Sequence, residues 1–119
     1  MVDLWHIYYV KKSRHTTPPK DKYVAIVCAC PNPYGFLINS KIGAYKEARP
    51  RLRDCQVLIS AAKYGFLAHD SYIDCSQLFS FKTGELDCIQ KIQNNTRASI
   101  KKVVSESTLI EPIYKKLIV

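Results

Sequence analysis

The eight residues Tyr23–Cys30 constrain the fold of this chain more than any other segment. They read YVAIVCAC, an almost unbroken run of apolar side chains with several β-branched members. A run that is this short and this apolar is typical of a strand covered on both faces. The turn sequence PNPYG follows it directly, at 31–35. The chain is therefore expected to fold around a buried strand.

Other short segments rich in β-branched and aromatic residues predict further strands. They lie at 5–12, 36–39, 55–60, 71–75, 78–81 and 88–92. Between them, the segment Ser40–Asp54 is polar and basic and contains Gly43 and Pro50. Such a segment is expected to be a long exposed connection, and loops of this length are usually functional or disordered.

Helices are expected only near the C-terminus. Apolar residues follow helical spacing between Thr96 and Ser105, and Asn94 or Asn95 offers a side-chain oxygen as the N-cap. Pro112 can open a second short helix as its first residue. The expected fold is thus mainly β, a small, strongly bent sheet or SH3-like barrel packed by a C-terminal helix. The 119 residues suit a single domain spanning 1–119.

The cysteines argue against a metal or disulfide framework. The spacing of the five contains no C-x-x-C pair, and the close pair Cys28 and Cys30 has no second close pair to complete a zinc site. We expect five free thiols, no metal and no cofactor. Neither a secretory leader nor an apolar run of about 20 residues is present, so we expect a cytoplasmic protein outside the membrane.

Positive charge is concentrated in the N-terminal half of the chain. The formal net charge is +8, and the segment Lys11–Arg53 holds ten lysines and arginines against two acidic residues. A concentrated positive field attracts phosphate backbones and speeds encounter with them. Solubility alone is the other explanation of this charge.

Two side chains from separate loops are predicted to meet beneath the basic connection. Lys22 lies just before the buried strand, and Ser40 lies just after the next one. If these strands are antiparallel neighbours, the start of one lies beside the end of the other. A lysine can stabilise charge that builds on phosphate oxygens, and a serine can position them. The alternative is that Lys22 is a solvated strand flank and Ser40 a turn residue.

Several weak motifs follow one another in an order typical of one family. They are IYYV near the start, then KDKYVAIV, FLINSK, HDSYIDCSQLFSF and TGEL, and finally a terminal amphipathic segment. In this order they resemble the MazF/PemK group of RNA-cutting toxins over nearly the whole chain. DSYIDCSQ is the most specific piece.

The resemblance implies a small barrel, usually a homodimer, that cleaves single-stranded RNA without metal and is paired with an acidic antitoxin protein. In this family the 2′-hydroxyl of the RNA attacks the phosphate and leaves a cyclic phosphate. By this likeness Lys22 takes the position of the catalytic arginine, Ser40 that of a threonine or serine, and Gln77 that of a glutamine near the groove. Phe79 stands where an arginine is common. These departures imply either a site shifted to Lys20, Lys22 and His15, or a related protein with little cleavage.

The preferred hypothesis is a toxin-type endoribonuclease, a hydrolase of single-stranded RNA. Tyr45 lies inside the basic connection and is predicted to stack on a base, because stacking tolerates any sequence. A second hypothesis is a catalytically weak module that binds RNA or a protein. A third is a phage or mobile-element protein that binds an acidic host protein. The residues predicted to contact the RNA backbone are Lys20, Lys41, Lys46, Arg49, Arg51 and Arg53.

Overall fold

A computed structural model describes residues 2–29 and 32–119, so the expectations for Cys30 lie outside the described residues. The strands are β1 (His6–Ser13), β2 (Lys20–Ala29), β3 (Pro33–Asn39), β4 (Gln56–Ile59), β5 (Ser71–Asp74), β6 (Phe79–Ser80) and β7 (Asp87–Lys91). The helices are α1 (Ala44–Glu47), α2 (Pro50–Arg53), α3 (Asn94–Glu106) and α4 (Pro112–Ile118), with a 3-10 turn at Thr83–Glu85.

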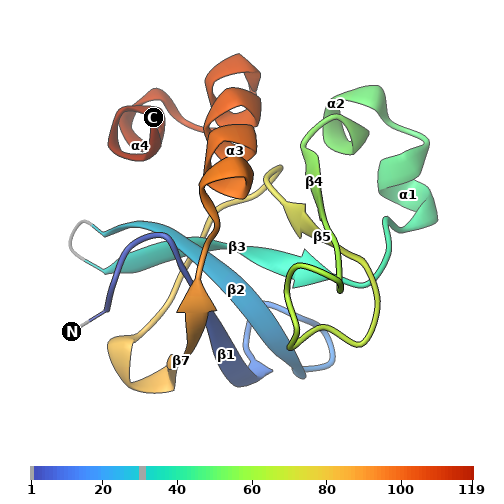
Figure 1. Cartoon of the computed structure of the whole chain (residues 1–119). Helices are drawn as coiled ribbons and strands as arrows, with labels where there is room; N and C mark the ends of the chain where they lie inside the picture. The colour runs from blue at the N-terminus through green and yellow to red at the C-terminus, as the bar shows by residue number, and fades with distance from the viewer. Residues whose placement is uncertain (1, 30–31) are drawn as a thin grey trace.

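The strands form one antiparallel sheet in the order β4-β5-β3-β2-β1-β7, with β6 paired to β3 (Figure 1). The apolar segment found in the sequence becomes β2, which pairs with β1 on one side and β3 on the other. Among the described residues, β4 and β7 form the two edges and the sheet does not close. The prediction of a mainly β fold is confirmed. Of the two expected forms, a strongly bent sheet or an SH3-like barrel, the closed barrel is not observed.

The two faces of the sheet support two apolar clusters of different size. Because side chains alternate along a strand, Ala25 and Val27 point to the larger cluster, whereas Val24 and Ile26 point to the smaller one. A register shift between Ile26 and Cys28 returns the side chain of Cys28 to the larger cluster. Both faces of β2 are therefore covered, as the apolar run predicts.

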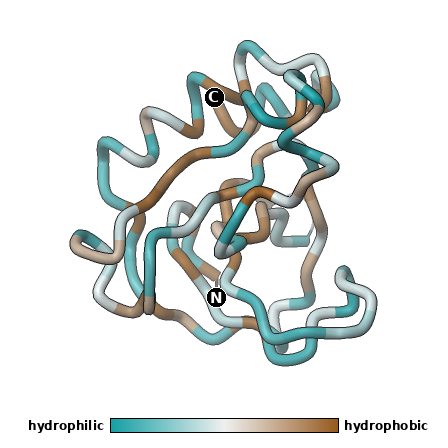
Figure 2. Tube along the Cα trace, turned by 90° about the vertical axis from the view of Figure 1, so that its right-hand side faces the viewer, coloured by the Kyte–Doolittle hydropathy of each residue, from teal (hydrophilic) through white to brown (hydrophobic). Residues whose placement is uncertain are grey.

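Helices α3 and α4 cover the larger cluster (Figure 1). Ile100 and Val104 of α3 and Ile118 of α4 are buried against the sheet. In Figure 2 brown, hydrophobic stretches run through the inside of the trace, while the outer loops are mostly teal or white. None of the helices among the described residues combines the length and the apolar character that crossing a bilayer requires.

The helix predictions are mostly confirmed, with two corrections. Helix α4 begins at Pro112, as expected. Helix α3 has Gln93 as its N-cap, without a side-chain capping bond, so the prediction of Asn94 or Asn95 is wrong. The segment 40–54 is mostly exposed, as expected of a long connection, but it contains the short helices α1 and α2, which were not expected. Neither of these short helices has a buried residue within Ala44–Glu47 or Pro50–Arg53.

Candidate functional site

A basic pocket lies where β2 begins and β3 ends, on the face of the smaller apolar cluster. Its volume is about 290 Å³. Three lysines contribute to its wall, together with one histidine and one carboxylate. Its lining residues, which define the basic pocket from here on, are His15, Thr16, Thr17, Lys20, Lys22, Leu37, Asn39, Lys46, Asp74, Gln77 and Phe79.

Strand alternation explains why residues distant in sequence meet at this pocket. Lys20 and Lys22 share a face of β2, and Leu37 and Asn39 share a face of β3. Because Tyr23 pairs with Ile38, the next step of the antiparallel register places Lys22 beside Asn39. The Lys22 ammonium donates a hydrogen bond to Asn39 Oδ1 at 2.5 Å. The start of β2 therefore lies beside the end of β3, as expected, but Lys22 contacts Asn39 and the predicted meeting with Ser40 is not observed.

Lys22 is held in an environment with more positive than negative charge. Its pKa lies below the ordinary value of 10.5, first because burial disfavours the charged form. The ammonium groups of Lys20 and Lys46 lower the pKa further, and Asp74 acts in the opposite direction. An anion placed among these lysines would relieve their mutual repulsion, and a phosphate group is such an anion.

Asp74 anchors α1 to the sheet from the end of β5. Its Oδ2 accepts a hydrogen bond from the ammonium of Lys46, forming an ion pair. Its Oδ1 accepts hydrogen bonds from Gln56 Nε2 at 2.9 Å, from the Ser76 amide at 3.1 Å and from the Ser76 hydroxyl at 2.5 Å. Burial raises the pKa of Asp74, but these bonds, above all that from Lys46, outweigh burial and leave the pKa below 3.8.

His15 lines the basic pocket and offers an imidazole ring with two nitrogens. Its Nε2 lies 2.6 Å from the carbonyl oxygen of Ser80, so Nε2 carries the proton that this contact requires. The rings of Phe79 and Phe81 pack against the imidazole, with centroids at 4.6 and 5.0 Å. In the neutral ring Nδ1 is then the nitrogen that can accept a proton.

The structure brings together some of the residues predicted from sequence and separates others. Lys20, Lys22, Lys46 and Gln77 all line the basic pocket. Ser40 follows β3 directly, but it is exposed and does not line the pocket.

The remaining predicted residues lie on or near α1 and α2. Lys41, Tyr45 and Arg49 are exposed on the segment that contributes Lys46 to the pocket. Arg51 instead hydrogen-bonds Thr108 on the far side of α2, and the Arg53 side chain lies 3.9 Å from Asp54.

Sequence reasoning did not assign Asp74 or Asn39 to the site. Asp74 lies within the strand predicted at 71–75, and its ion pair joins positions 28 residues apart. A sequence signal existed for Asn39, because it directly precedes Ser40 at the end of the predicted strand.

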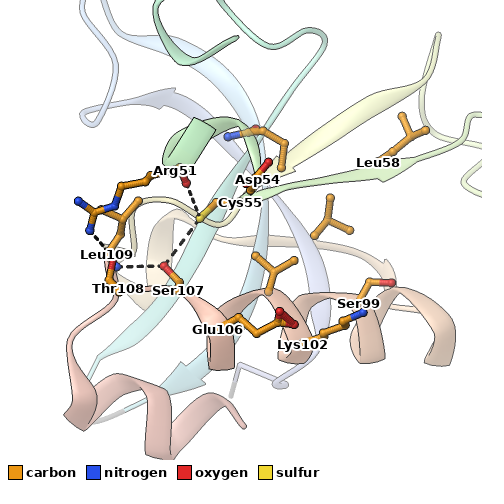
Figure 3. Close-up of a pocket in the computed structure, with 13 residues that line it drawn as sticks. Arg51, Asp54, Cys55, Leu58, Ser99, Lys102, Glu106, Ser107, Thr108 and Leu109 are labelled. Atoms are coloured by element: carbon orange, nitrogen blue, oxygen red, sulfur yellow. Dashed lines mark hydrogen bonds between the residues drawn. The ribbon is translucent and has the colours of Figure 1, made fainter. Parts of the chain in front are cut away.

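A larger groove of about 760 Å³ lies between β4, α3 and the segment 107–109 (Figure 3). Figure 3 shows Cys55 at its base, where the thiol contacts the Arg51 carbonyl oxygen at 3.2 Å and the Ser107 hydroxyl at 3.7 Å. Its charged residues are balanced, with Arg51 and Lys102 against Asp54 and Glu106. This balance gives no preference for an anion, so we place the candidate site at the basic pocket.

No family model matches the chain, and no curated protein matches it.

Proposed function

We propose that this protein is a metal-independent endoribonuclease that cleaves single-stranded RNA at the basic pocket, as in the MazF/PemK-like toxins. The observation that carries the proposal is the convergence of Lys20, Lys22 and Lys46 on one small pocket beside His15. The mainly β sheet with a C-terminal helix is consistent with a small β fold, while the closed barrel that the resemblance implies is not observed. A cytoplasmic homodimer regulated by an acidic antitoxin protein is part of the same proposal.

In the proposed reaction the 2′-oxygen of a ribose attacks the adjacent phosphorus and the 5′-oxygen of the next nucleotide leaves. The 2′-hydroxyl proton passes to a base, and a proton is returned to the leaving 5′-oxygen, so no net proton is consumed. The products are a 2′,3′-cyclic phosphate and a 5′-hydroxyl. Nδ1 of His15 is the proposed proton acceptor, since Nε2 is engaged by Ser80.

Negative charge increases on the phosphate oxygens as the new bond forms. The Lys22 ammonium uses one of its three donors on Asn39, and two remain for phosphate oxygens. Lys46 likewise uses one donor on Asp74. Both ammonium groups are thus held in place before the substrate arrives, which is the condition under which charge stabilisation is most effective.

The test is cleavage of single-stranded RNA in the presence of a metal chelator, with the product ends identified by mass spectrometry. We expect cyclic phosphate and 5′-hydroxyl ends, and we expect Lys22→Ala to slow cleavage about 100- to 1,000-fold. Lys22→Arg should retain activity because a guanidinium also binds phosphate well. Lys116→Ala, which removes an equal charge from the exposed part of α4, is the matched control and should cleave normally. Wild-type cleavage by Lys22→Ala would contradict the proposed site.

A second candidate function is RNA binding without cleavage. The observation favouring it is that the Ser40 hydroxyl lies outside the basic pocket, while Phe79 occupies its wall where related toxins commonly have an arginine. This alternative predicts salt-dependent binding of single-stranded RNA and no cyclic phosphate product in the assay above.

A further inference from the structure

Tyr45 is an aromatic side chain with no role in the core. It is 65% exposed, and it lies on α1, none of whose residues Ala44–Glu47 is buried. An exposed aromatic ring in a basic region is a common means of binding unpaired bases, because every base has a π-face.

Arg49 holds the ring of Tyr45 from one side. The guanidinium carbon lies 3.5 Å from the centroid of the ring, within the range of a cation–π contact. The same guanidinium donates a hydrogen bond from Nη1 to the carbonyl oxygen of Tyr45 at 2.8 Å. Arg49 therefore fixes the ring orientation and adds a positive charge behind it, and a base can stack on the opposite face of the ring.

The ring is also fixed relative to the basic pocket. Tyr45 directly precedes Lys46, whose ammonium is paired with the buried Asp74. The Cα atoms of the two residues are about 3.8 Å apart, but successive residues of a helix turn by about 100°, so the two side chains leave the backbone in different directions. The Lys46 side chain is 33% exposed and reaches inward to Asp74, whereas Tyr45 is 65% exposed and faces solvent.

We propose that Tyr45 and Arg49 form a base-stacking subsite for single-stranded RNA, one nucleotide away from the phosphate bound by Lys22 and Lys46. The inference rests on the proposed binding of RNA at the basic pocket. It adds that affinity depends on a base at one defined position of the strand, and not on backbone charge alone.

The experiment measures the affinity of a short 2′-O-methyl RNA, which cannot be cleaved because its 2′-oxygens are blocked. A parallel series of strands lacks one base at each successive position. Tyr45→Leu keeps an apolar side chain without an aromatic ring and should weaken binding of the intact strand roughly 5- to 150-fold. Tyr45→Phe should bind within about twofold of the wild type, because the ring is retained. Ile113→Ala, at a residue that is 64% exposed on α4, is the matched control and should bind normally.

The base-free strands separate stacking from an indirect effect on Lys46. One base-free strand should bind the wild-type protein as weakly as the intact strand binds Tyr45→Leu. Tyr45→Leu should bind that same base-free strand with the affinity of the wild type. If Tyr45→Leu weakens every strand equally, or leaves the intact strand unaffected, the stacking subsite is wrong while the proposed function stands. If the wild-type protein does not bind the intact strand, both proposals fail together.

Discussion

Replacing Asp74 by asparagine tests whether the buried carboxylate fixes α1 to the sheet. Asparagine can keep its oxygen at the Oδ1 position, where Gln56 and Ser76 donate. Its amide group then replaces Oδ2 and presents hydrogens to the Lys46 ammonium, so the ion pair is lost. Hydrogen bonds to charged groups contribute about 1.5–3 kcal/mol, and neutral ones about 0.5–1.5 kcal/mol. Because the Lys46 side chain is already 33% exposed and can turn into water, we expect a total loss of about 2 kcal/mol.

The assay is urea unfolding of the wild type and of Asp74→Asn at several pH values. The folded pKa of Asp74 lies below 3.8, so the carboxylate contributes stability that is fully present above that pH. The contribution is lost as the pH falls through the lower, folded pKa. The free-energy difference between wild type and variant should therefore be constant from pH 7 to about pH 5 and shrink by pH 3.

Asp54→Asn is the matched control for a surface carboxylate. The Asp54 side chain is 76% exposed and lies 3.9 Å from Arg53. Its replacement should change the free energy of unfolding by less than about 0.5 kcal/mol. A difference between wild type and Asp74→Asn that stays the same at pH 3 and pH 7, or that does not exceed the change from Asp54→Asn, would refute the reasoning.

Three further predictions follow from other parts of the molecule. Gly35→Ala should lower the free energy of unfolding, measured in urea, by about 1–3 kcal/mol or more, because its Cβ would lie 2.5 Å from the Ala25 carbonyl oxygen. Gly65→Ala, with nothing within 4 Å of its Cβ, should change the free energy of unfolding little. RNA affinity, measured by fluorescence anisotropy, should fall with rising pH at a pH below the ordinary lysine value of 10.5, because the pKa of Lys22 is lowered and only the charged form attracts phosphate. If Lys22→Ala loses affinity at the same pH as the wild type, this prediction is contradicted. Iodoacetamide should label Cys88 faster than Cys75 in the folded protein, because Cys88 is exposed whereas burial raises the pKa of Cys75 well above 9.0. Equal labelling rates for the two thiols, measured by mass spectrometry, would contradict this.

The sheet could be predicted from sequence because its strongest signals are local. The apolar run that becomes β2 and the helical spacing of Ile100 and Val104 each appear within a few residues of one another. The boundaries were less predictable, since Lys20 and Lys22 belong to β2 and not to a preceding loop. A charged strand end and a loop look alike when the pairing with β1 and β3 is unknown.

The candidate site could be predicted only in part. Lys22 was placed correctly at the end of β3, because antiparallel neighbours put a strand start beside a strand end. The contribution of Asp74 depends on α1 folding back over the sheet, and on a bond between residues distant in the chain. Polar residues between Ser40 and Asp54 give no periodic apolar signal, so their short helices were not expected.

The absence of buried residues within α1 and α2 has a consequence for how this part of the molecule moves. The two helices rest on the sheet through polar contacts, chiefly the ion pair of Lys46 with Asp74, while the sheet keeps its own apolar clusters. Their amide hydrogens should therefore exchange with solvent through a local opening, at a free energy well below that of global unfolding. Added salt weakens phosphate binding steeply, but it screens an ion pair with a buried carboxylate much less. RNA should therefore leave the pocket at an ionic strength that changes amide exchange in α1 and α2 only slightly.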